Sequence, residues 1–517
     1  MALPNDFTAQ LKPHPNADGA RILADERLRS EIDIKSLSLR LFGTKYLERQ
    51  QRILSIILQH RVFSKANQAN LSRPDRYKLG LARGKRMRQL MDEHSWDDDD
   101  LLMAEYLVDD IQPYHLHMSL FTSAMREQCS DEQRREWMPK IAAWEVIGAY
   151  AQTELGHGSN VRGIELSATW DGASKSFILH IQIRVLPLLA TAFALHYSGA
   201  AMRELYERTR STNALDGDRA QLAELHSTSA GLKSLATELA ANGIETCRRA
   251  MGGHGYSGGT GLVQLNADYL SKPTVEGDNW MITQQVARSL IKKVGEAIAA
   301  PDRTAASSTD ACLMVFQKDQ RKTTAASILR DDAAIVAAFE NRMAWMAFRA
   351  HRLREVEKRS WNSLLIDFHK LSRAYSQCIL VTSFYKALDA DEVPAGPTRA
   401  VLFDLFRLFA FTTMDADSRE FQQSGAVAAT DLDALQERIL ELMGRIRPHA
   451  VRLVDAFALP DYLLDSALGR YDGKVYEQLF YNAHVLNPLN RTTFNPDYRS
   501  DEIVMGSGDG GAILAKL

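Results

Sequence analysis

The stretch FILHIQIRVLPLLATAF, residues 177–193, decides the fold of this chain because two patterns meet in it without a linker. Its first half belongs to a strand-like hairpin, in which runs at 164–170 and 176–183 flank the turn residues 171–173. Its second half opens an apolar, helix-like run at Leu186. A single hairpin is too little β structure to be stable alone. We therefore expect a mainly α protein with a small β remnant.

Helical patterns dominate the remainder of the chain. Ser130 and Gln133 have the spacing of a capping pair at the start of one helix. Amphipathic spacing predicts longer helical regions over 24–60, 75–94, 186–293 and 325–458. The organisation that we expect is an N-terminal arm (1–24), an N-terminal helical domain (25–150), the β remnant (151–183), a helical bundle (184–299), a linker (300–312), a C-terminal helical domain (313–500) and a flexible tail (501–517).

The composition argues against several classes of protein. Lys and Arg total 62 against 65 for Asp and Glu, which disfavours a nucleic-acid binder that neutralises phosphates. The four cysteines are far apart without a C-x-x-C pair, so we expect neither a disulfide framework nor a metal site. The apolar run 185–195 contains Pro187 and is too short to span a bilayer, so we expect a soluble protein without a membrane span.

The C-terminal residues carry a targeting pattern. Ala515, Lys516 and Leu517 form a conservative variant of the S-K-L peroxisomal signal, and the glycine-rich stretch 506–511 leaves this end accessible. The sequence therefore predicts a peroxisomal location and an import receptor as a partner.

A glycine-containing motif, AYAQTELGHGSNVRG at 149–163, precedes the hairpin. Gly156 and Gly158, followed by Ser159, leave backbone amides uncovered, so a planar or phosphorylated ligand can approach closely. Thr153 adds a hydroxyl that can donate and accept a hydrogen bond. Alone, this motif predicts no more than a ligand-binding loop.

A carboxylate is central to a second motif, KPTVEGDNW, which ends at Trp280. We predict an extended segment after Pro273, followed directly by a helix, with Gly277 freeing the backbone beside Glu276. A carboxylate held there against an apolar pocket would have a raised pKa and could act as a general base. The alternative is an ordinary helix N-terminus, because Glu276 and Asp278 both suit the positive end of a helix dipole.

A third motif, GGHGY at 252–256, follows a helix-like stretch. Gly253 and Gly255 let the chain turn and let a ligand or a neighbouring subunit come close. A helix C-cap would explain one glycine, whereas several glycines around His254 indicate a further role. No partner for His254 is visible in the sequence, so histidine chemistry is not required.

Together these motifs resemble the peroxisomal acyl-CoA oxidase family, flavoenzymes related to the acyl-CoA dehydrogenases. The resemblance runs in family order from about residue 25 and covers most of the chain. The segments that carry it are 112–121, 144–171, 186–202, 224–237, 242–257, 273–288 and 453–480.

The resemblance implies a specific reaction. An acyl-CoA would be oxidised to trans-2-enoyl-CoA with FAD as cofactor, and molecular oxygen would be reduced to hydrogen peroxide, in β-oxidation or in tailoring an acyl chain for a specialised metabolite. Glu276 matches the family base that removes the α-proton. A peroxisomal homodimer is implied as well. The expected cofactor contacts are Thr153, Gly156, Gly158, Ser159, Gly253, Gly255 and Asn279.

The resemblance breaks within 177–193. In the family, a β-barrel domain and the first bundle helix lie between the segments that match 177–179 and 186–194. About 150 residues are missing, the size of a typical domain, and they include contacts to FAD. We therefore expect acyl-CoA oxidase-like helical domains, a truncated β region and two C-terminal helical domains. Three functions stay open: an oxidase, an acyl-CoA dehydrogenase, and a non-catalytic or partner-dependent acyl-CoA-binding protein.

Overall fold

The computed structural model describes most of the chain, and the described residues fall into two compact units. The N-terminal unit is Met1–Ala151 with Pro488–Leu517, and the C-terminal unit is Gln152–Asn487. The described residues are 28, 33–65, 68, 71–110, 113–149, 175–212, 219–256, 258–318, 327–390, 396–459, 461–464 and 466–491.

The N-terminal unit is helical, and its helices begin where local chemistry favours a start. Gly43 separates the first two helices of the predicted region 24–60, and Asp97 and Ser130 cap later ones through backbone amides. The predicted pair of Ser130 and Gln133 forms a capping box, which confirms that prediction. The helices are α3 (Ile34–Phe42), α4 (Thr44–Ile57), α5 (Arg73–Glu93), α6 (Asp98–Val108), α7 (Thr122–Gln128) and α8 (Asp131–Ala142).

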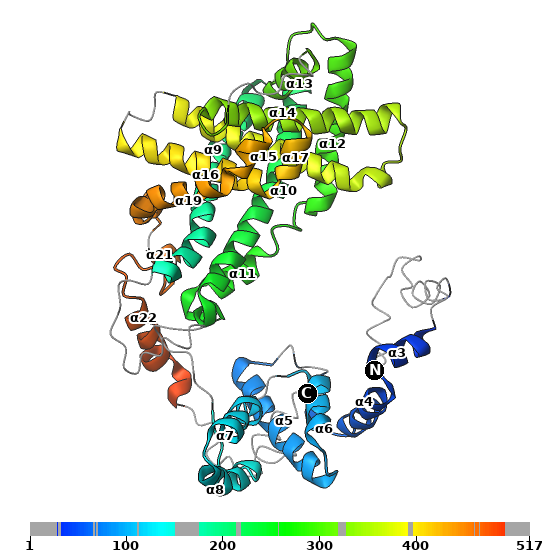
Figure 1. Cartoon of the computed structure of the whole chain (residues 1–517), viewed down its shortest axis with the longest axis vertical. Helices are drawn as coiled ribbons and strands as arrows, with labels where there is room; N and C mark the ends of the chain where they lie inside the picture. The colour runs from blue at the N-terminus through cyan, green and yellow to red at the C-terminus, as the bar shows by residue number, and fades with distance from the viewer. Residues whose placement is uncertain are drawn as a thin grey trace. The chain divides into compact units, whose positions relative to one another are not determined.

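The C-terminal unit contains the longest helices of the described chain. Helices α14, α15 and α16 lie across α9, α10 and α12 and pack against them (Figure 1). These elements are α9 (Lys175–Thr212), α10 (Arg219–Ala250), α11 (Leu262–Tyr269), α12 (Asn279–Ala299), α13 (Ser308–Lys318), α14 (Asp332–His351), α15 (Leu365–Asp389), α16 (Pro397–Ala416), α17 (Ser418–Gln423), α18 (Ala429–Asp433), α19 (Leu435–Ile446), α20 (Ala450–Asp455), α21 (Asp461–Leu464) and α22 (Val475–Tyr481).

One hydrophobic core joins the predicted bundle 184–299 to the predicted C-terminal domain 313–500. Leu186 and Leu290 from the first segment are buried in the same cluster as Phe339, Phe384 and Phe406 from the second. The predicted linker 300–312 overlaps the start of α13 at Ser308, and the connection from α12 joins two parts of one packed unit.

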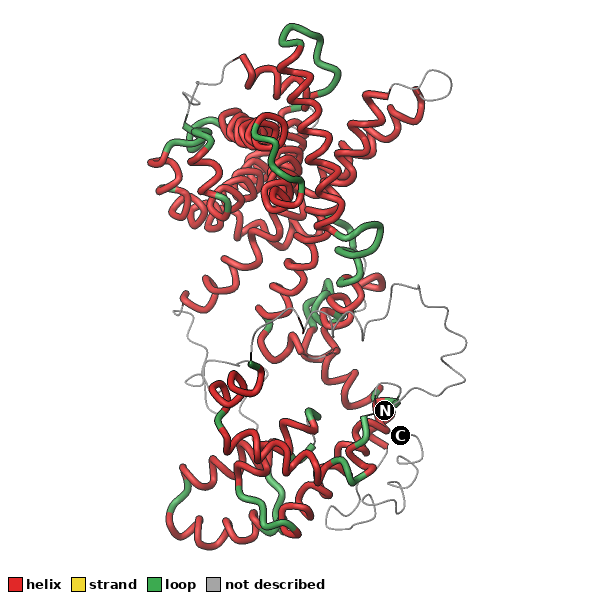
Figure 2. Tube along the Cα trace, turned by 90° about the vertical axis from the view of Figure 1, so that its right-hand side faces the viewer, coloured by secondary structure: helices red, strands yellow, loops and turns green. Residues whose placement is uncertain are grey.

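The described residues contain helices and loops but no strand (Figure 2). The predicted second strand, 176–183, is wrong, because helix α9 already begins at Lys175. The predicted first strand, 164–170, lies outside the described residues. A strand needs a neighbour for its backbone hydrogen bonds, whereas a helix satisfies them internally. The apolar sequence that follows lets 175–183 extend α9 instead.

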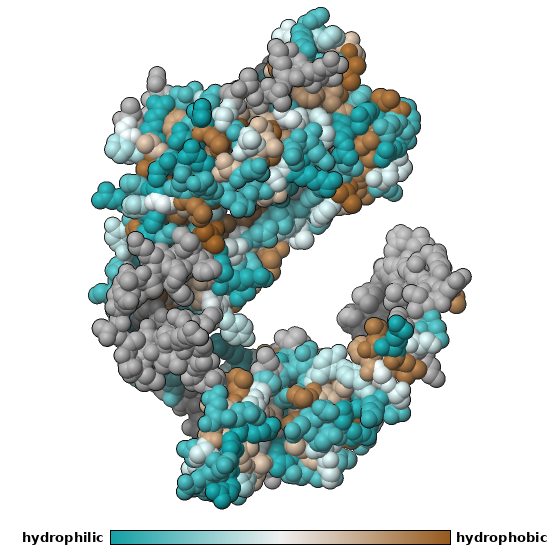
Figure 3. Space-filling view, viewed as in Figure 1, coloured by the Kyte–Doolittle hydropathy of each residue, from teal (hydrophilic) through white to brown (hydrophobic). Residues whose placement is uncertain are grey.

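Helix α9 is longer and more apolar than the run 185–195 indicates. Within the described residues, its segment Gln182–Arg210 is the one stretch long and apolar enough to cross a membrane by length and composition. Phe193 and Ala194 are nevertheless buried in the shared core, while Tyr206 is exposed. Packing against α10, α15 and α16 accounts for the core face of this helix. The molecular face in Figure 3 is mainly hydrophilic, with small hydrophobic patches.

Candidate functional site

Glu276 lies in a tight turn between α11 and α12. The amides of Thr274 and Val275 donate to the carbonyl oxygen of Ser271 at 3.1 and 3.0 Å, so the predicted extended segment is wrong. The predicted helix start is confirmed, because α12 begins at Asn279. These two local hydrogen bonds fold the residues after Pro273 into a turn, so the backbone there is not extended.

The backbone at Glu276 is strained. Its φ is +58°, and that of Gly277 is +103°. The left-handed region costs a residue with a side chain on the order of 1–2 kcal/mol, whereas glycine adopts it freely. Gly277 is also needed for space, because a Cβ atom there would lie 2.5 Å from Cγ2 of Ile282. Asp278 then caps α12, with its Oδ1 accepting from the amide of Trp280 at 2.9 Å.

Lys233 on α10 contacts this turn at several points. Its Nζ donates to the carbonyl oxygens of Pro273 at 3.3 Å and Gly277 at 2.6 Å, and to Oδ1 of Asn279 at 3.0 Å. The segment that carries Glu276 is therefore tied to the neighbouring helix on both sides of the carboxylate. The sequence around Lys233 does not indicate these contacts, because the residues that it bonds lie about 40 residues further along the chain.

Asn279, predicted as a cofactor contact, is 5 % exposed and directs its amide toward α10. Its Nδ2 donates to the carbonyl of Ser234 and to Oγ1 of Thr237, both at 3.1 Å. Its Oδ1 accepts from Lys233. These bonds use both polar atoms of the amide within the protein, so in this structure the side chain fastens the turn to α10 instead of facing an open surface.

The carboxylate of Glu276 faces solvent rather than the expected apolar pocket. Large apolar residues beside it in sequence are also exposed: 45 % of Val275, 56 % of Trp280 and 63 % of Met281. Trp280 stacks on His369 of α15, with ring centroids 3.8 Å apart. The turn thus presents a carboxylate amid uncovered apolar side chains, a surface that a further protein segment or a ligand could cover.

The GGHGY motif forms a short 3-10 helix, Gly252–Tyr256, immediately after α10. Gly255 is buried, and a Cβ atom on it would lie 1.8 Å from the carbonyl oxygen of Arg248. Gly252 has a φ of +57° with open space around it, as expected where a helix ends. Packing and backbone conformation therefore explain these two glycines without a ligand. Gly253 is exposed and remains available for the predicted cofactor contact.

The first motif cannot be placed beside these two. Thr153, Gly156, Gly158 and Ser159 lie outside the described residues. Among the described residues, a pocket next to the turn is lined by Asn279, Trp280 and His369, and it has a volume of about 160 Å³. Cofactor and drug-sized ligands generally occupy about 300–1,000 Å³. The pocket beside the turn is therefore smaller than a site for a cofactor such as FAD.

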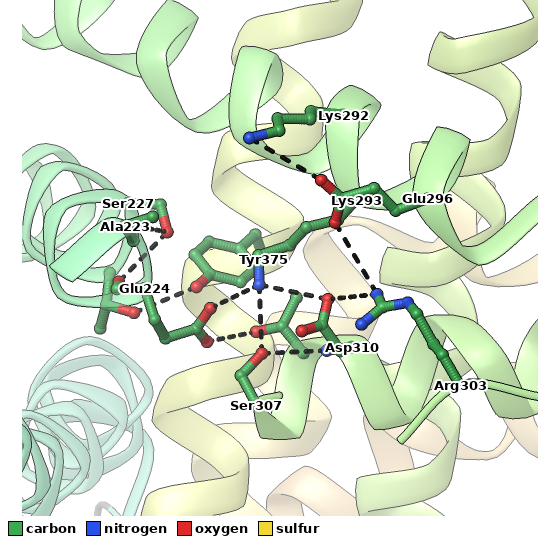
Figure 4. A network of polar contacts seen from close by, with 12 residues as sticks. Ala223, Glu224, Ser227, Lys292, Lys293, Glu296, Arg303, Ser307, Asp310 and Tyr375 are labelled. Carbon is green, nitrogen blue, oxygen red and sulfur yellow. Dashed lines mark hydrogen bonds and ion pairs between the residues drawn. The ribbon is translucent and has the colours of Figure 1, made fainter. Parts of the chain in front are cut away.

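A buried charge network, which the sequence did not reveal, lies elsewhere in the same unit (Figure 4). Lys293 of α12 contacts Glu224 at 3.0 Å and Asp310 at 3.2 Å, and Arg303 also contacts Asp310 at 3.2 Å. Thr309 donates to Glu224 at 2.6 Å. Although burial opposes ionisation, Lys293 and Arg303 hold the pKa of Asp310 below its ordinary value. The network joins α10, α12 and α13.

This network borders a cavity of about 1,020 Å³ between α9, α10, α13 and α15. Tyr375, whose hydroxyl lies 3.1 Å from that of Thr228, lines it, and burial raises the pKa of Tyr375 to about 12. Burial also raises the pKa of Cys378 to about 12 and raises that of Cys312. A thiol with a raised pKa is a poor nucleophile, so we assign these two cysteines to packing.

Three family models match the chain. They are Acyl-coenzyme A oxidase N-terminal over 33–147, the Acyl-CoA oxidase C-alpha1 domain over 179–291, and Acyl-CoA oxidase over 331–501. The interval 148–178 lies between the first two matches and contains both the unplaced motif and most of the predicted hairpin.

Peroxisomal acyl-coenzyme A oxidase 1 of Arabidopsis thaliana is 25 % identical over 653 residues, covering 93 % of this chain and 97 % of that protein. The rat protein of the same name is 25 % identical over 632 residues, covering 87 % and 94 %. Because the chain has 517 residues, at least 136 of the 653 positions have no counterpart in it. This deficit confirms that most of the central domain is missing.

Solved structures share the fold. Arabidopsis thaliana acyl-CoA oxidase 1 has a TM-score of 0.56 at 24 % identity, covering 91 % of this chain and 97 % of that one. Caenorhabditis elegans acyl-CoA oxidase-1, solved with FAD and ATP, has a TM-score of 0.57 at 20 % identity, covering 91 % and 96 %. The Caenorhabditis elegans structure contains FAD, the cofactor that the sequence predicts, and both curated relatives are named as peroxisomal proteins. The chain belongs to the acyl-CoA oxidase family.

Proposed function

We propose that this chain acts on acyl-CoA thioesters, with Glu276 as the base that removes the α-proton. The observation that carries this proposal is the construction of the turn: a strained carboxylate-bearing residue is fixed to α10 at the start of α12. Strain of this kind persists where the surrounding structure imposes it, and it concentrates at functional sites. A positioned base accelerates proton transfer by roughly 100- to 10,000-fold.

The chemistry assigned to this chain is the proton transfer. The thioester carbonyl acidifies the α-carbon, and the carboxylate of Glu276 accepts its proton. FAD supplies the hydride acceptor of the family reaction, and we propose molecular oxygen as the final electron acceptor and a homodimer as the assembly. Size-exclusion chromatography with light scattering measures the assembly directly.

Glu276→Gln tests the base without changing the size of the side chain. With an acyl-CoA substrate and added FAD, we expect peroxide formation to fall at least about 100-fold, because the amide cannot accept the proton. Glu296→Gln is the matched control, since Glu296 is a partly exposed residue on α12, the helix that follows the turn. Equal peroxide formation by the Glu276→Gln variant and the wild type would exclude this assignment. Turnover with a dye acceptor but without peroxide would indicate a dehydrogenase.

A second candidate is a partner-dependent acyl-CoA-binding protein. The exposure of Glu276 and its apolar neighbours, together with the missing positions, favours this alternative. In that case the purified chain would lack flavin absorbance near 450 nm and would bind acyl-CoA with the same affinity before and after Glu276→Gln. Full flavin occupancy with peroxide formation would favour the oxidase.

A further inference from the structure

We propose that Lys233 is the positioning residue of the base turn, an inference that rests on the proposed role of Glu276. The φ of +58° at Glu276 is not a conformation that this residue favours by itself. Contacts outside the turn must therefore hold the carboxylate in one place. Among the described residues, Lys233 is the side chain that reaches acceptors on both sides of Glu276.

The hydrogen bonds of Lys233 all go to the turn or to the first residue of α12. Two of its three acceptors are backbone carbonyl oxygens, those of Pro273 and Gly277, and the third is Oδ1 of Asn279. An ammonium group has three donors, so these contacts use its full capacity. Within the described residues, no carboxylate lies at ion-pair distance from Lys233, although α10 also carries Glu238 five residues further along. The ammonium group of Lys233 therefore holds these three oxygens in place, two of them in the backbone of the turn.

Other contacts close the turn and start α12, so the positioning of Glu276 by Lys233 can be tested without unfolding the helices. The amide of Asn279 donates to the carbonyl of Pro273 at 3.0 Å, and Asp278 caps α12 independently. These bonds close the turn and start the helix without Lys233. Among the described residues, in contrast, the carbonyl oxygen of Gly277 accepts a hydrogen bond from Lys233 alone. Removing the ammonium should therefore free the residues next to the carboxylate while α10 and α12 stay folded.

The test compares Lys233→Met with Lys233→Arg and with the matched control Lys292→Met. Lys292 is an exposed lysine on α12 that forms a surface contact with Glu296. Hydrogen–deuterium exchange of the peptide spanning 274–281 is measured on the full chain without ligand. We expect exchange at least about tenfold faster in Lys233→Met, and near wild type in the other two variants, because a guanidinium can still donate to two carbonyls.

Peroxide kinetics provide the second measurement. We expect Lys233→Met to lower kcat about 10- to 100-fold while KM changes less than about threefold, because a displaced base impairs chemistry more than binding. Lys233→Arg should restore most of kcat. Unchanged exchange in Lys233→Met would overturn the proposal, and so would faster exchange with an unchanged kcat. If the wild type forms no peroxide, the proposed function fails, and the exchange result still decides whether Lys233 holds the turn.

Discussion

Gly255→Ala distinguishes a packing role from a cofactor role for the GGHGY motif. The added Cβ atom would lie 1.8 Å from the carbonyl oxygen of Arg248, whereas real contacts are essentially never shorter than 3.0 Å. The obstacle is backbone, so the chain must move by about 1.2 Å or more at this point. Overpacking of this kind costs about 1–3 kcal/mol, and a rigid backbone obstacle places the expected loss near the upper end.

Differential scanning calorimetry of the full chain measures this loss. The C-terminal unit spans Gln152–Asn487, and an unfolding entropy of about 2.1 cal/mol/K per residue gives roughly 0.7 kcal/mol/K for it. A loss of about 2–3 kcal/mol therefore lowers the Tm of this unit by about 3–4 °C. The transition of the N-terminal unit serves as an internal reference, because the substitution lies outside it.

Two neighbouring glycines are matched controls. Gly258→Ala meets nothing within 4 Å and should change stability by less than about 0.5 kcal/mol. Gly252→Ala also enters open space, but its φ of +57° should cost about 1 kcal/mol. The reasoning is refuted if Gly255→Ala leaves the Tm within 1 °C of the wild type, and a loss of bound flavin alone would then assign Gly255 to the cofactor.

Three further substitutions test separate parts of the fold by urea denaturation of the full chain. Ser130→Ala should cost about 1 kcal/mol by removing the N-cap of α8, and no change would show that the capping box is unimportant. Arg342→Met should cost about 3 kcal/mol, because a buried guanidinium that contacts Asp417 is lost; a neutral result would contradict this. Asp310 has a lowered pKa, so its stabilisation is present above its ordinary value and is lost as the pH falls below about 4. Asp310→Asn should flatten the stability profile below about pH 4, and an unchanged slope there would exclude Asp310 as its source.

Short-range sequence patterns predicted the structural features that depend on contacts within a few residues. The capping box at Ser130 and the start of α12 near Trp280 follow from interactions across three or four residues, and both are present. The mainly α fold follows equally from apolar spacing. The single core shared by α9, α12, α14 and α15 does not, because its contacts join residues far apart in the sequence.

In the candidate site, too, the sequence predicted some features and missed others. Glu276 was found from its motif, and Gly277 was expected to free the backbone beside it, as its φ of +103° shows. The exposure of Glu276 and the inward turn of Asn279 were not foreseen, because both depend on which surface neighbours the turn. Lys233 was missed for the same reason: three acceptors at residues 273, 277 and 279 define its role, and none is near it in the chain.

The failed strand prediction explains how the shortened chain accommodates its junction. Residues 176–183 have a pattern suited to a sheet, yet the chain joins them directly to the apolar run that opens at Leu186. With no described strand to pair with, their backbone groups can be satisfied locally only as helix. Helix α9 thus takes up the sequence at the junction, and separately the apolar residues around Glu276 are exposed. The helical unit keeps one shared hydrophobic core, whereas the turn that carries Glu276 keeps its apolar neighbours exposed.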